Sequence, residues 1–186
     1  RNKFWEANSP DQIVHLQIDP SNPNTWKKKS LINILQESNV IINLAGEPIA
    51  EKRWTKEHCQ KIKNSRISTT TNLINAINSL KRPPQLLING SAIGFYGTSQ
   101  NKEFDEDNQS GKDFLAELCS EWEAIARKKH KSTRLVILRI GIVLEKDGGA
   151  LGKMLPIFRT GFGGPLGNGK QWMSWIHRTD LCQIIE

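Results

Sequence analysis

The sequence predicts an α/β fold in which a doubly wound parallel sheet lies between two layers of helices. Three observations predict it. Short apolar runs rich in β-branched residues recur along the chain, helical patterns separate these runs, and the runs are continuously apolar rather than alternating. Strands that are covered on both faces have this composition. Right-handed crossovers through the intervening helices then build a three-layer α/β/α arrangement.

The strands of this sheet are expected at four apolar runs. They are Val40–Leu44, Leu86–Ile88, Leu135–Ile140 and, with a weaker composition, Trp172–Ile176. An earlier segment, Ile13–Ile18, alternates more between apolar and polar residues, which is typical of an outer strand.

Helices are expected between these runs. From Ile62 to Leu80, apolar or small side chains recur every three to four residues, and Pro83 and Pro84 end the pattern because proline cannot continue a helix. A second apolar stripe runs from Asp113 to Ala126. A further helix is expected to begin near Thr179-Asp180, where either side chain can serve as the N-cap.

Two connecting segments have a distinctive composition. Thr98–Lys112 is polar and rich in turn residues, so it is expected to be a surface loop or a lid. Gly148–Gly169 is rich in glycine and follows a strand, which favours a mobile segment over a site. Its glycines do not follow a buried strand and Pro165 interrupts them, so a substrate-side or structural loop is favoured over a phosphate-binding loop.

Length and composition limit the class of protein. A chain of 186 residues fits one domain. It contains no apolar stretch long enough to span a membrane and no apolar signal core at its start, which favours a cytoplasmic protein without a membrane partner. Three widely spaced cysteines indicate neither a disulfide scaffold nor a metal site.

The net charge of +7 permits binding of an anionic ligand or of nucleic acid. The basic clusters Lys27–Lys29 and Arg127–Lys131 lack interleaved aromatic residues, however, which favours a solvated surface. Nucleic acid is therefore not an expected partner, whereas a nucleotide cofactor would use only a few of these charges.

Small residues follow three of the predicted strands. Ala45-Gly46 follows the first, Ser91 and its neighbours follow the second, and Gly141 follows the third. In an open α/β sheet, ligands bind beyond the carboxyl ends of the strands. The three strand ends are therefore expected to converge on one crevice.

Several ordered motifs carry a family resemblance. They are Asn43–Ile49, Arg53–Thr55, Ser65-Arg66, Ser91–Gly97, Asp113–Cys119 with Trp122-Glu123, Arg139–Gly141, Gly148–Leu151, Gly161–Gly169 and Ser174–His177. From about Val40 onward the chain resembles the atypical, epimerase-like short-chain dehydrogenases/reductases. The resemblance implies a Rossmann-like NAD(P)-binding fold.

The resemblance also bears on the extent of the domain. Proteins of this kind open with a strand and a Gly-x-x-Gly-x-x-Gly turn that holds the pyrophosphate, and no such motif precedes Val40. They are also longer than this chain. We therefore expect residues 1–186 to form a single NAD(P)-binding domain that is incomplete at its N-terminus and largely lacks the C-terminal substrate-binding part.

The resemblance implies NADP as the cofactor and assigns four residues beside it. Leu44, Ala45 and Gly46 are expected to contact it, since a small residue there lets the backbone approach the adenosine ribose. Leu144 is expected on the nicotinamide side, through packing or its backbone.

Three basic residues are also expected near the cofactor. Lys61 and Arg66 match positions on the helix after this loop, where a guanidinium can hold a phosphate with two hydrogen bonds. The alternatives are a solvated lysine and an arginine that supports the helix. Arg1 falls where a basic residue faces the 2′-phosphate and favours NADP over NAD.

For catalysis, the superfamily uses a serine to hold the substrate oxygen and a tyrosine to pass the proton, aided by a lysine one helical turn later. Ser91 matches the serine. At the tyrosine and lysine positions this chain has Phe114 and Leu118, neither of which carries a proton. Tyr96 is the only tyrosine in the chain, and it is expected either to line the substrate or to do the acid/base work.

Two function classes follow. In the first, the protein is an NADP-dependent oxidoreductase or epimerase acting on a small molecule, for which a nucleotide sugar is one candidate, and it forms a homodimer. Hydride transfer would then be the chemistry of the cofactor. In the second, which Phe114 and Leu118 favour, it is a catalytically silent NADP-binding protein with a regulatory or redox-sensing role.

Overall fold

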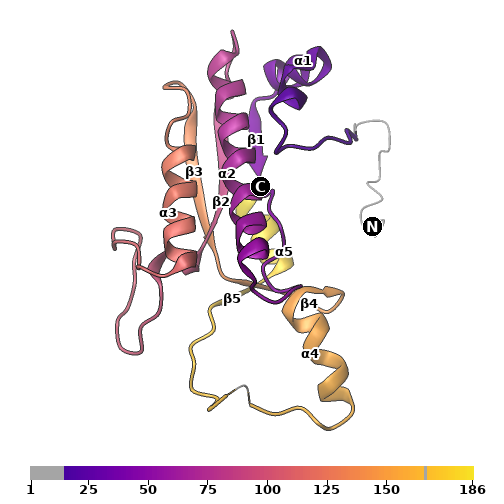
Figure 1. The fold of residues 1–186 in the computed structure, drawn as a ribbon, viewed down its shortest axis with the longest axis vertical. Helices are drawn as coiled ribbons and strands as arrows, with labels where there is room; N and C mark the ends of the chain where they lie inside the picture. The colour runs from indigo at the N-terminus through magenta and orange to yellow at the C-terminus, as the bar shows by residue number, and fades with distance from the viewer. Residues whose placement is uncertain (1–14, 166) are drawn as a thin grey trace.

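The computed structural model describes residues 15–165 and 167–186, and it contains two parallel sheets (Figure 1). The larger sheet has the strand order β1-β2-β3 and the smaller sheet pairs β4 with β5. The strands are β1 Val40–Asn43, β2 Leu86–Ala92, β3 Arg134–Ile140, β4 Ile142–Glu145 and β5 Trp175–His177.

Two helices connect the strands of the larger sheet. α2 (Lys56–Ser79) leads from β1 to β2, and α3 (Phe114–Ala126) leads from β2 to β3. Figure 1 shows the two helices side by side on one face of the sheet. Strand, helix and parallel strand follow one another twice, so the predicted α/β fold class is confirmed.

The core lies between α2 and the sheet. Leu73, Ile74 and Ile77 of α2 pack against Leu87 of β2, and all four side chains are buried. Ile41 of β1 packs against the same cluster. The helical spacing of the α2 side chains brings them to one face, which explains why the sequence pattern located this helix.

The opposite side of β1 is more open. Val40 and Ile42 alternate with Ile41 along the strand and are 48% and 49% exposed. Among the described residues, β1 is therefore covered mainly on the side of α2, although its continuous apolar run indicates cover on both faces.

A short helical arm precedes β1. It consists of the 3₁₀ helix η2 (Pro23–Lys27) and α1 (Lys29–Glu37), neither of which the sequence analysis predicted. Leu31 and Leu35 of α1 pack with Leu80 at the end of α2. A second 3₁₀ helix, η3 (Ile93–Tyr96), follows β2 directly.

The outer strand predicted at Ile13–Ile18 is wrong where the structure describes it. Residues 15–18 have no regular structure, and residues 13 and 14 lie outside the described residues. Ile18 packs against the Leu31, Leu35 and Leu80 cluster. Its apolar side chain thus has a packing role that requires no strand.

The chain after β3 differs most from the prediction. Gly149–Arg159 of the predicted mobile segment forms the helix α4, with Pro156 inside it. Of the run Trp172–Ile176, only the last two residues belong to β5, and β5 pairs with β4 rather than with the larger sheet. β4 itself was not predicted, because its residues follow β3 after a single glycine.

Gly141 explains why the chain passes from the larger sheet to the smaller one between β3 and β4. A Cβ atom at this position would lie 2.7 Å from the carbonyl oxygen of Ser174. Only glycine therefore lets the segments around residues 141 and 174 approach each other this closely. The backbone amide of Ile142 donates to the same oxygen at 2.9 Å. The last helix, α5 (Arg178–Ile185), begins directly after β5. Its N-cap is His177, whose side chain accepts a hydrogen bond from the Thr179 amide.

No helix among the described residues combines the length and apolar character that a membrane span requires.

Candidate functional site

The register of the larger sheet brings three strand ends to one edge. Asn43 of β1 pairs with Asn89 of β2, and Asn89 pairs with Ile137 of β3. Two residues further along each strand come Ala45, Ser91 and Arg139. Ala45 and Ser91 therefore lie at one edge of the sheet, as expected, and Gly141 follows two residues after Arg139. The convergence of all three on a single crevice stays a prediction.

A cavity of about 420 Å³ lies beside the end of β1. Three segments line it: the chain before η2, the loop after β1, and the first half of α2. The lining residues are Asp19, Pro20, Ser21, Ala45, Gly46, Glu47, Lys61, Asn64, Ser65 and Thr69. Ala45, Gly46 and Lys61 of the predicted cofactor-binding set are thus together in one cavity.

Hydrogen bonds hold the loop that forms one wall. The amide nitrogen of the Asn43 side chain donates to Asn89 Oδ1 at 2.7 Å and to Thr70 Oγ1 at 3.0 Å. The backbone amide of Glu47 donates to Ser65 Oγ at 2.9 Å. These bonds tie the loop to β2 and α2, so its backbone is fixed at the cavity.

Arg66 lies beneath this loop and does not line the cavity. Its Nη1 donates to the carbonyl oxygens of Glu47 at 3.0 Å and Ile62 at 3.1 Å, and its guanidinium lies 5.5 Å from the Trp122 ring. Burial lowers the pKa of Arg66 from its ordinary value. A Cβ atom at Gly46 would lie 2.8 Å from Arg66 Cζ, so the glycine lets the loop rest on the guanidinium.

Leu44 and Leu144, which are also expected cofactor residues, do not line the cavity. Leu44 follows β1 and is 52% exposed. Leu144 lies in β4, in the smaller sheet, where it pairs with His177. Arg1 lies outside the described residues.

Ser91 and Tyr96 are connected through a buried ion pair. Ser91 Oγ donates to Glu123 Oε1 at 2.7 Å, and Arg139 binds both carboxylate oxygens of Glu123, through Nε at 2.9 Å and Nη2 at 3.0 Å. Arg139 Nη1 donates to Tyr96 Oη at 2.8 Å. The two expected catalytic side chains therefore share one network.

This ion pair is fixed in its charged form. Burial alone would raise the pKa of Glu123, but hydrogen bonds from Arg139 and Ser91 outweigh it and lower that pKa below its ordinary value. The bonds with Glu123, and also with Tyr96, raise the pKa of Arg139. The side chain of Glu123 is 3% exposed and that of Arg139 is 15% exposed, so the carboxylate is shielded from bulk water and the guanidinium largely so.

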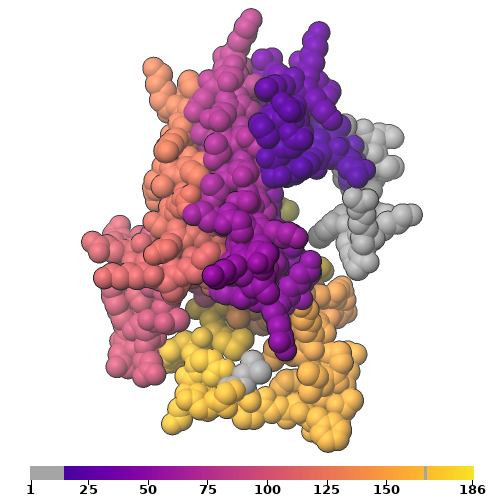
Figure 2. Space-filling view, in the orientation of Figure 1, coloured from indigo at the N-terminus to yellow at the C-terminus, as the bar shows by residue number. Residues whose placement is uncertain are grey.

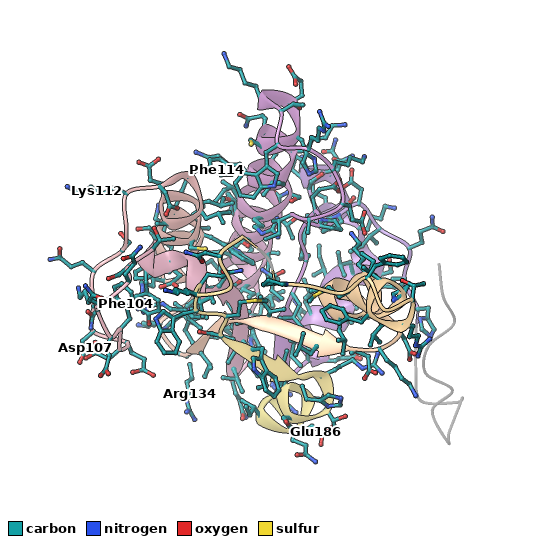
Figure 3. All side chains as sticks on the ribbon, turned by 90° about the horizontal axis from the view of Figure 1, so that it is seen from below. Phe104, Asp107, Lys112, Phe114, Arg134 and Glu186 are labelled. Carbon is teal, nitrogen blue, oxygen red and sulfur yellow. The ribbon has the colours of Figure 1, made fainter. Side chains whose placement is uncertain are left out.

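Aromatic rings surround Tyr96. Phe104 stacks on it with 5.1 Å between ring centroids, and Phe95 meets it edge to face. Phe104 lies on the loop between η3 and α3, which Figure 3 shows along one side of the molecule together with Asp107. Glu106 of this loop accepts a hydrogen bond from Arg139 Nη1 at 3.1 Å. The polar segment predicted as a surface loop is thus fastened over Tyr96.

Phe114 and Leu118 occupy apolar surroundings. The Phe114 ring, labelled in Figure 3, lies edge to face with Trp54 at 5.9 Å, and Leu118 is buried. The two positions that hold tyrosine and lysine in the superfamily therefore serve packing here.

Two groups of residues in this region were not predicted from the sequence. Asp19 and Ser21 reach the cavity from a segment without regular structure, and no sequence pattern signals this. Glu123 and Arg139 lie inside recognised motifs, and each interrupts an apolar pattern with a charge. Since buried charges are paired, that interruption was a usable signal.

Comparison with known proteins adds family evidence. Residues 5–186 match the family described as the NAD dependent epimerase/dehydratase family. The chain is 48% identical over 162 residues to the chloroplastic homolog of epimerase family protein SDR39U1 from Arabidopsis thaliana, covering 86% of this chain and 45% of that protein. It is 40% identical over 164 residues to epimerase family protein SDR39U1 from Homo sapiens, covering 87% and 56%. The chain thus spans about half the length of these relatives.

Several solved structures are also similar to this chain. The human epimerase family protein SDR39U1 (isoform 2), solved with NADPH, matches with a TM-score of 0.76 and 38% identity over 83% of this chain and 55% of that chain. The nucleoside-diphosphate sugar epimerase from Corynebacterium glutamicum matches with a TM-score of 0.68 and 33% identity over 83% and 32%. WbmG from Bordetella bronchiseptica, at 11% identity over 91% and 51%, has a TM-score of 0.72 and supports the fold alone. These likenesses agree with the predicted Rossmann-like fold.

Proposed function

The chain belongs to the NAD dependent epimerase/dehydratase family, and on that premise we propose that it binds NADP and contributes to an oxidoreductase or epimerase acting on a small molecule. The observation that carries the proposal is the cavity beside β1, where Ala45, Gly46 and Lys61 come together at the carboxyl edge of a parallel sheet. NADPH in the solved human relative supports the choice of NADP.

The residues present fit a nucleotide. The fixed backbone of Ala45 and Gly46 forms a wall without bulky side chains, and Lys61 adds a positive charge that suits a phosphate. Asn64 adds an amide group that could donate to a phosphate or ribose oxygen, and the Ser65 oxygen could accept from a ribose hydroxyl. Bound NADP would supply hydride transfer, and the chain would supply its orientation.

The remaining cofactor residues have different supporting evidence. Leu44 adjoins the cavity loop in sequence and is half exposed, which suits a contact with the cofactor. Leu144 on the nicotinamide side and Arg1 at the 2′-phosphate rest on the family resemblance. Arg66 supports the loop from beneath, so its contribution to NADP binding would be largely through Gly46 and Glu47.

For catalysis we propose Ser91 and Tyr96. Ser91 donates its proton to Glu123, so its oxygen is left to accept a hydrogen bond, which suits a substrate hydroxyl. Tyr96 Oη accepts from Arg139, so its own proton is left for donation. One group would hold a substrate oxygen and the other would pass a proton.

The finer features of the proposal have narrower support. A nucleotide sugar as substrate is supported by the likeness to a nucleoside-diphosphate sugar epimerase. A homodimer and a cytoplasmic location stay predictions from the sequence, and the Arabidopsis relative is named as chloroplastic.

A second function, silent NADP binding with a regulatory or redox-sensing role, is supported by a specific observation. Phe114 packs against Trp54 and Leu118 is buried, so neither can move a proton. A protein of this kind would use the same cavity and bind NADP without turnover.

Fluorescence titration with NADPH tests the cavity. Lys61→Ala is expected to weaken binding about fivefold, because a charge-assisted hydrogen bond at an exposed site contributes about 1 kcal/mol. Lys63→Ala is the matched control, since Lys63 pairs with Glu121 at 2.7 Å and does not line the cavity. Equal effects of the two substitutions, or no NADPH binding at all, would overturn the assignment.

Turnover separates the two functions. Carbonyl compounds and sugar nucleotides would be screened with NADPH by loss of nicotinamide absorbance, in the unchanged protein and in Tyr96→Phe. Turnover that Tyr96→Phe abolishes supports the enzyme. Turnover that survives unchanged removes Tyr96 from the mechanism, and NADPH binding without turnover of any compound supports the silent binder.

A further inference from the structure

We infer that Arg139 and Glu123 are the positioning residues of this site: Arg139 gives Tyr96 the cation that Leu118 cannot provide, and Glu123 joins that cation to Ser91. The inference rests on the proposed roles of Tyr96 and Ser91. It adds two residues from different elements, β3 and α3, to a site that the family resemblance describes through Ser91 and Tyr96 alone.

The contacts of Arg139 with Tyr96 support its role as the cation beside the phenol. Nη1 donates to the phenolic oxygen at 2.8 Å, and the guanidinium carbon lies 5.0 Å from the centroid of the tyrosine ring. The same guanidinium covers Phe95 at 3.7 Å. Phe104 stacks on the ring of Tyr96, so the phenol contacts both an aromatic ring and a cation.

Glu123 links Arg139 to Ser91. Its Oε1 accepts from both Ser91 and Arg139, so a single oxygen joins the two sides of the site. The geometry of the Arg139–Glu123 pair is bidentate, with both carboxylate oxygens engaged. Bidentate pairs fix orientation as well as charge, so movement of Arg139 would also displace the Ser91 hydroxyl.

The position of the cation is unusual for the superfamily. There the lysine comes from the same helix as the tyrosine, one turn later, but here that turn carries the buried Leu118. Arg139 comes instead from the neighbouring strand β3, opposite Ser91 in the sheet register. The cation and the tyrosine therefore reach each other from different elements, and neither depends on Phe114.

The charged surroundings of Tyr96 are few among the described residues. From β3 it meets Arg139, from α3 the carboxylate of Glu123 stands behind Arg139, and from the covering loop Glu106 contributes its carbonyl oxygen. Lys102 of that loop lies over Phe104 at 5.1 Å, one ring further away. Arg139 is thus the charge in direct contact with the phenol.

The single tyrosine makes the test direct. Protein labelled with ¹³C at the tyrosine Cζ gives one resonance, which reports the surroundings of the Tyr96 phenol alone. We expect Arg139→Gln to move this resonance at neutral pH, because the phenolic oxygen loses its hydrogen bond from a cation. Arg139→Lys, which keeps a cation, should move it less.

Arg127→Gln is the matched control. Arg127 also binds Glu123, at 3.5 Å, but its side chain is 62% exposed and has no contact with Tyr96 among its described interactions. Arg127→Gln should leave the resonance where it lies in the unchanged protein. A resonance that Arg139→Gln leaves unmoved in a folded protein, as judged by circular dichroism, would overturn the role of Arg139.

A double variant covers the risk that Arg139→Gln does not fold. Glu123→Gln with Arg139→Met removes both charges, so no ion stays buried without a partner. This double variant should also move the Tyr96 resonance, because the phenol again loses its cation. An unmoved resonance in this variant would likewise overturn the role of Arg139.

Glu123 has its own test at neutral pH. Glu123→Gln should move the tyrosine resonance, because Arg139 loses its charged partner, whereas Glu121→Gln on the exposed face of α3 should leave it in place. A resonance unmoved in Glu123→Gln would overturn the coupling. These measurements need neither NADPH nor substrate, so their failure is distinguishable from a failure of cofactor binding.

Discussion

Two regions of the molecule differ in how they are held together. The packed region, residues 15–140, contains every buried side chain of the described core. In the open region, residues 141–186, no described residue is buried, and Phe162 and Trp172 are 85% and 86% exposed. Figure 2 shows the open region as an orange-to-yellow segment at the bottom of the molecule, hollowed beside the body. Both regions contain strands and helices, but only the packed region buries side chains in a core.

The number of strands and their cover explain the difference. β1, β2 and β3 form a three-stranded sheet against α2 and α3, whereas β4 and β5 form a two-stranded sheet paired over three residues. A two-stranded sheet is marginal without a packed face. Polar contacts hold the open region instead, such as Arg178 with Glu145 at 3.0 Å and Lys153 with the Ala50 carbonyl at 3.2 Å. We expect it to open at lower free energy than the packed region.

The largest expected effect contrasts an apolar side chain from each region. Ile77→Ala in α2 should lower the free energy of unfolding by about 4 kcal/mol, because Ile77 is completely buried and its loss leaves a cavity. Ile184→Ala in α5, where the side chain is 64% exposed, should cost less than about 0.5 kcal/mol. Urea unfolding followed by circular dichroism measures both. Similar losses would remove the contrast.

The next effect concerns the buried ion pair of the packed region. Glu123→Ala should cost about 3 kcal/mol, since it leaves Arg139 without its carboxylate partner. Glu121→Ala breaks the surface pair with Lys63 two residues earlier on α3 and should cost less than about 1 kcal/mol. The same urea experiment compares them, and a Glu123→Ala loss as small as that of the control would show that the pair is not buried in solution.

A local effect is expected at the junction of the two regions. Gly141→Ala places a Cβ atom against the Ser174 carbonyl and should loosen the β4–β5 pair by about 2 kcal/mol. Hydrogen exchange of the β4 amides should accelerate while that of β2 stays the same. Gly148→Ala is the control, because nothing lies within 4 Å of a Cβ atom there. Equal acceleration in β2 would mean that the two regions unfold together.

The smallest effect is a dependence on acid. The pKa of Glu123 is lowered in the folded protein, so its contribution to stability is present above the ordinary glutamate value of 4.5 and is lost as the pH falls through the lowered value. Glu123→Gln should therefore flatten the loss of stability below that pH. Thermal unfolding across the acid range measures this, and identical acid profiles of variant and unchanged protein would contradict it.

The packed region could be read from the sequence because its signals are local. The apolar runs at β1, β2 and β3 and the stripes of α2 and α3 each repeat with the period of the element that they form. α2 begins six residues before the predicted start, at Lys56, because Thr55 caps it through a bond from the His58 amide rather than through an apolar residue. A capping residue is a weaker sequence signal for the start of a helix than a periodic apolar pattern.

The site was predicted in part. Ala45 and Gly46 follow β1, Ser91 lies near the end of β2, and parallel strands end at one edge, so a common edge for these residues could be expected. Asp19, Ser21 and the Glu123–Arg139 bridge could not be located in the same way, since their contacts join residues that are far apart in the chain.

The sequence by itself determined the α/β class, the main strand and helix positions and the edge where the small residues gather, because hydrophobic period and strand direction are local properties. The tertiary structure alone decided that β4 and β5 form a separate sheet, that Arg66 lies beneath the cavity loop and that Arg139 reaches Tyr96. Such outcomes depend on side chains meeting across distant segments, where a single steric contact, such as that of Gly141 with Ser174, selects the arrangement.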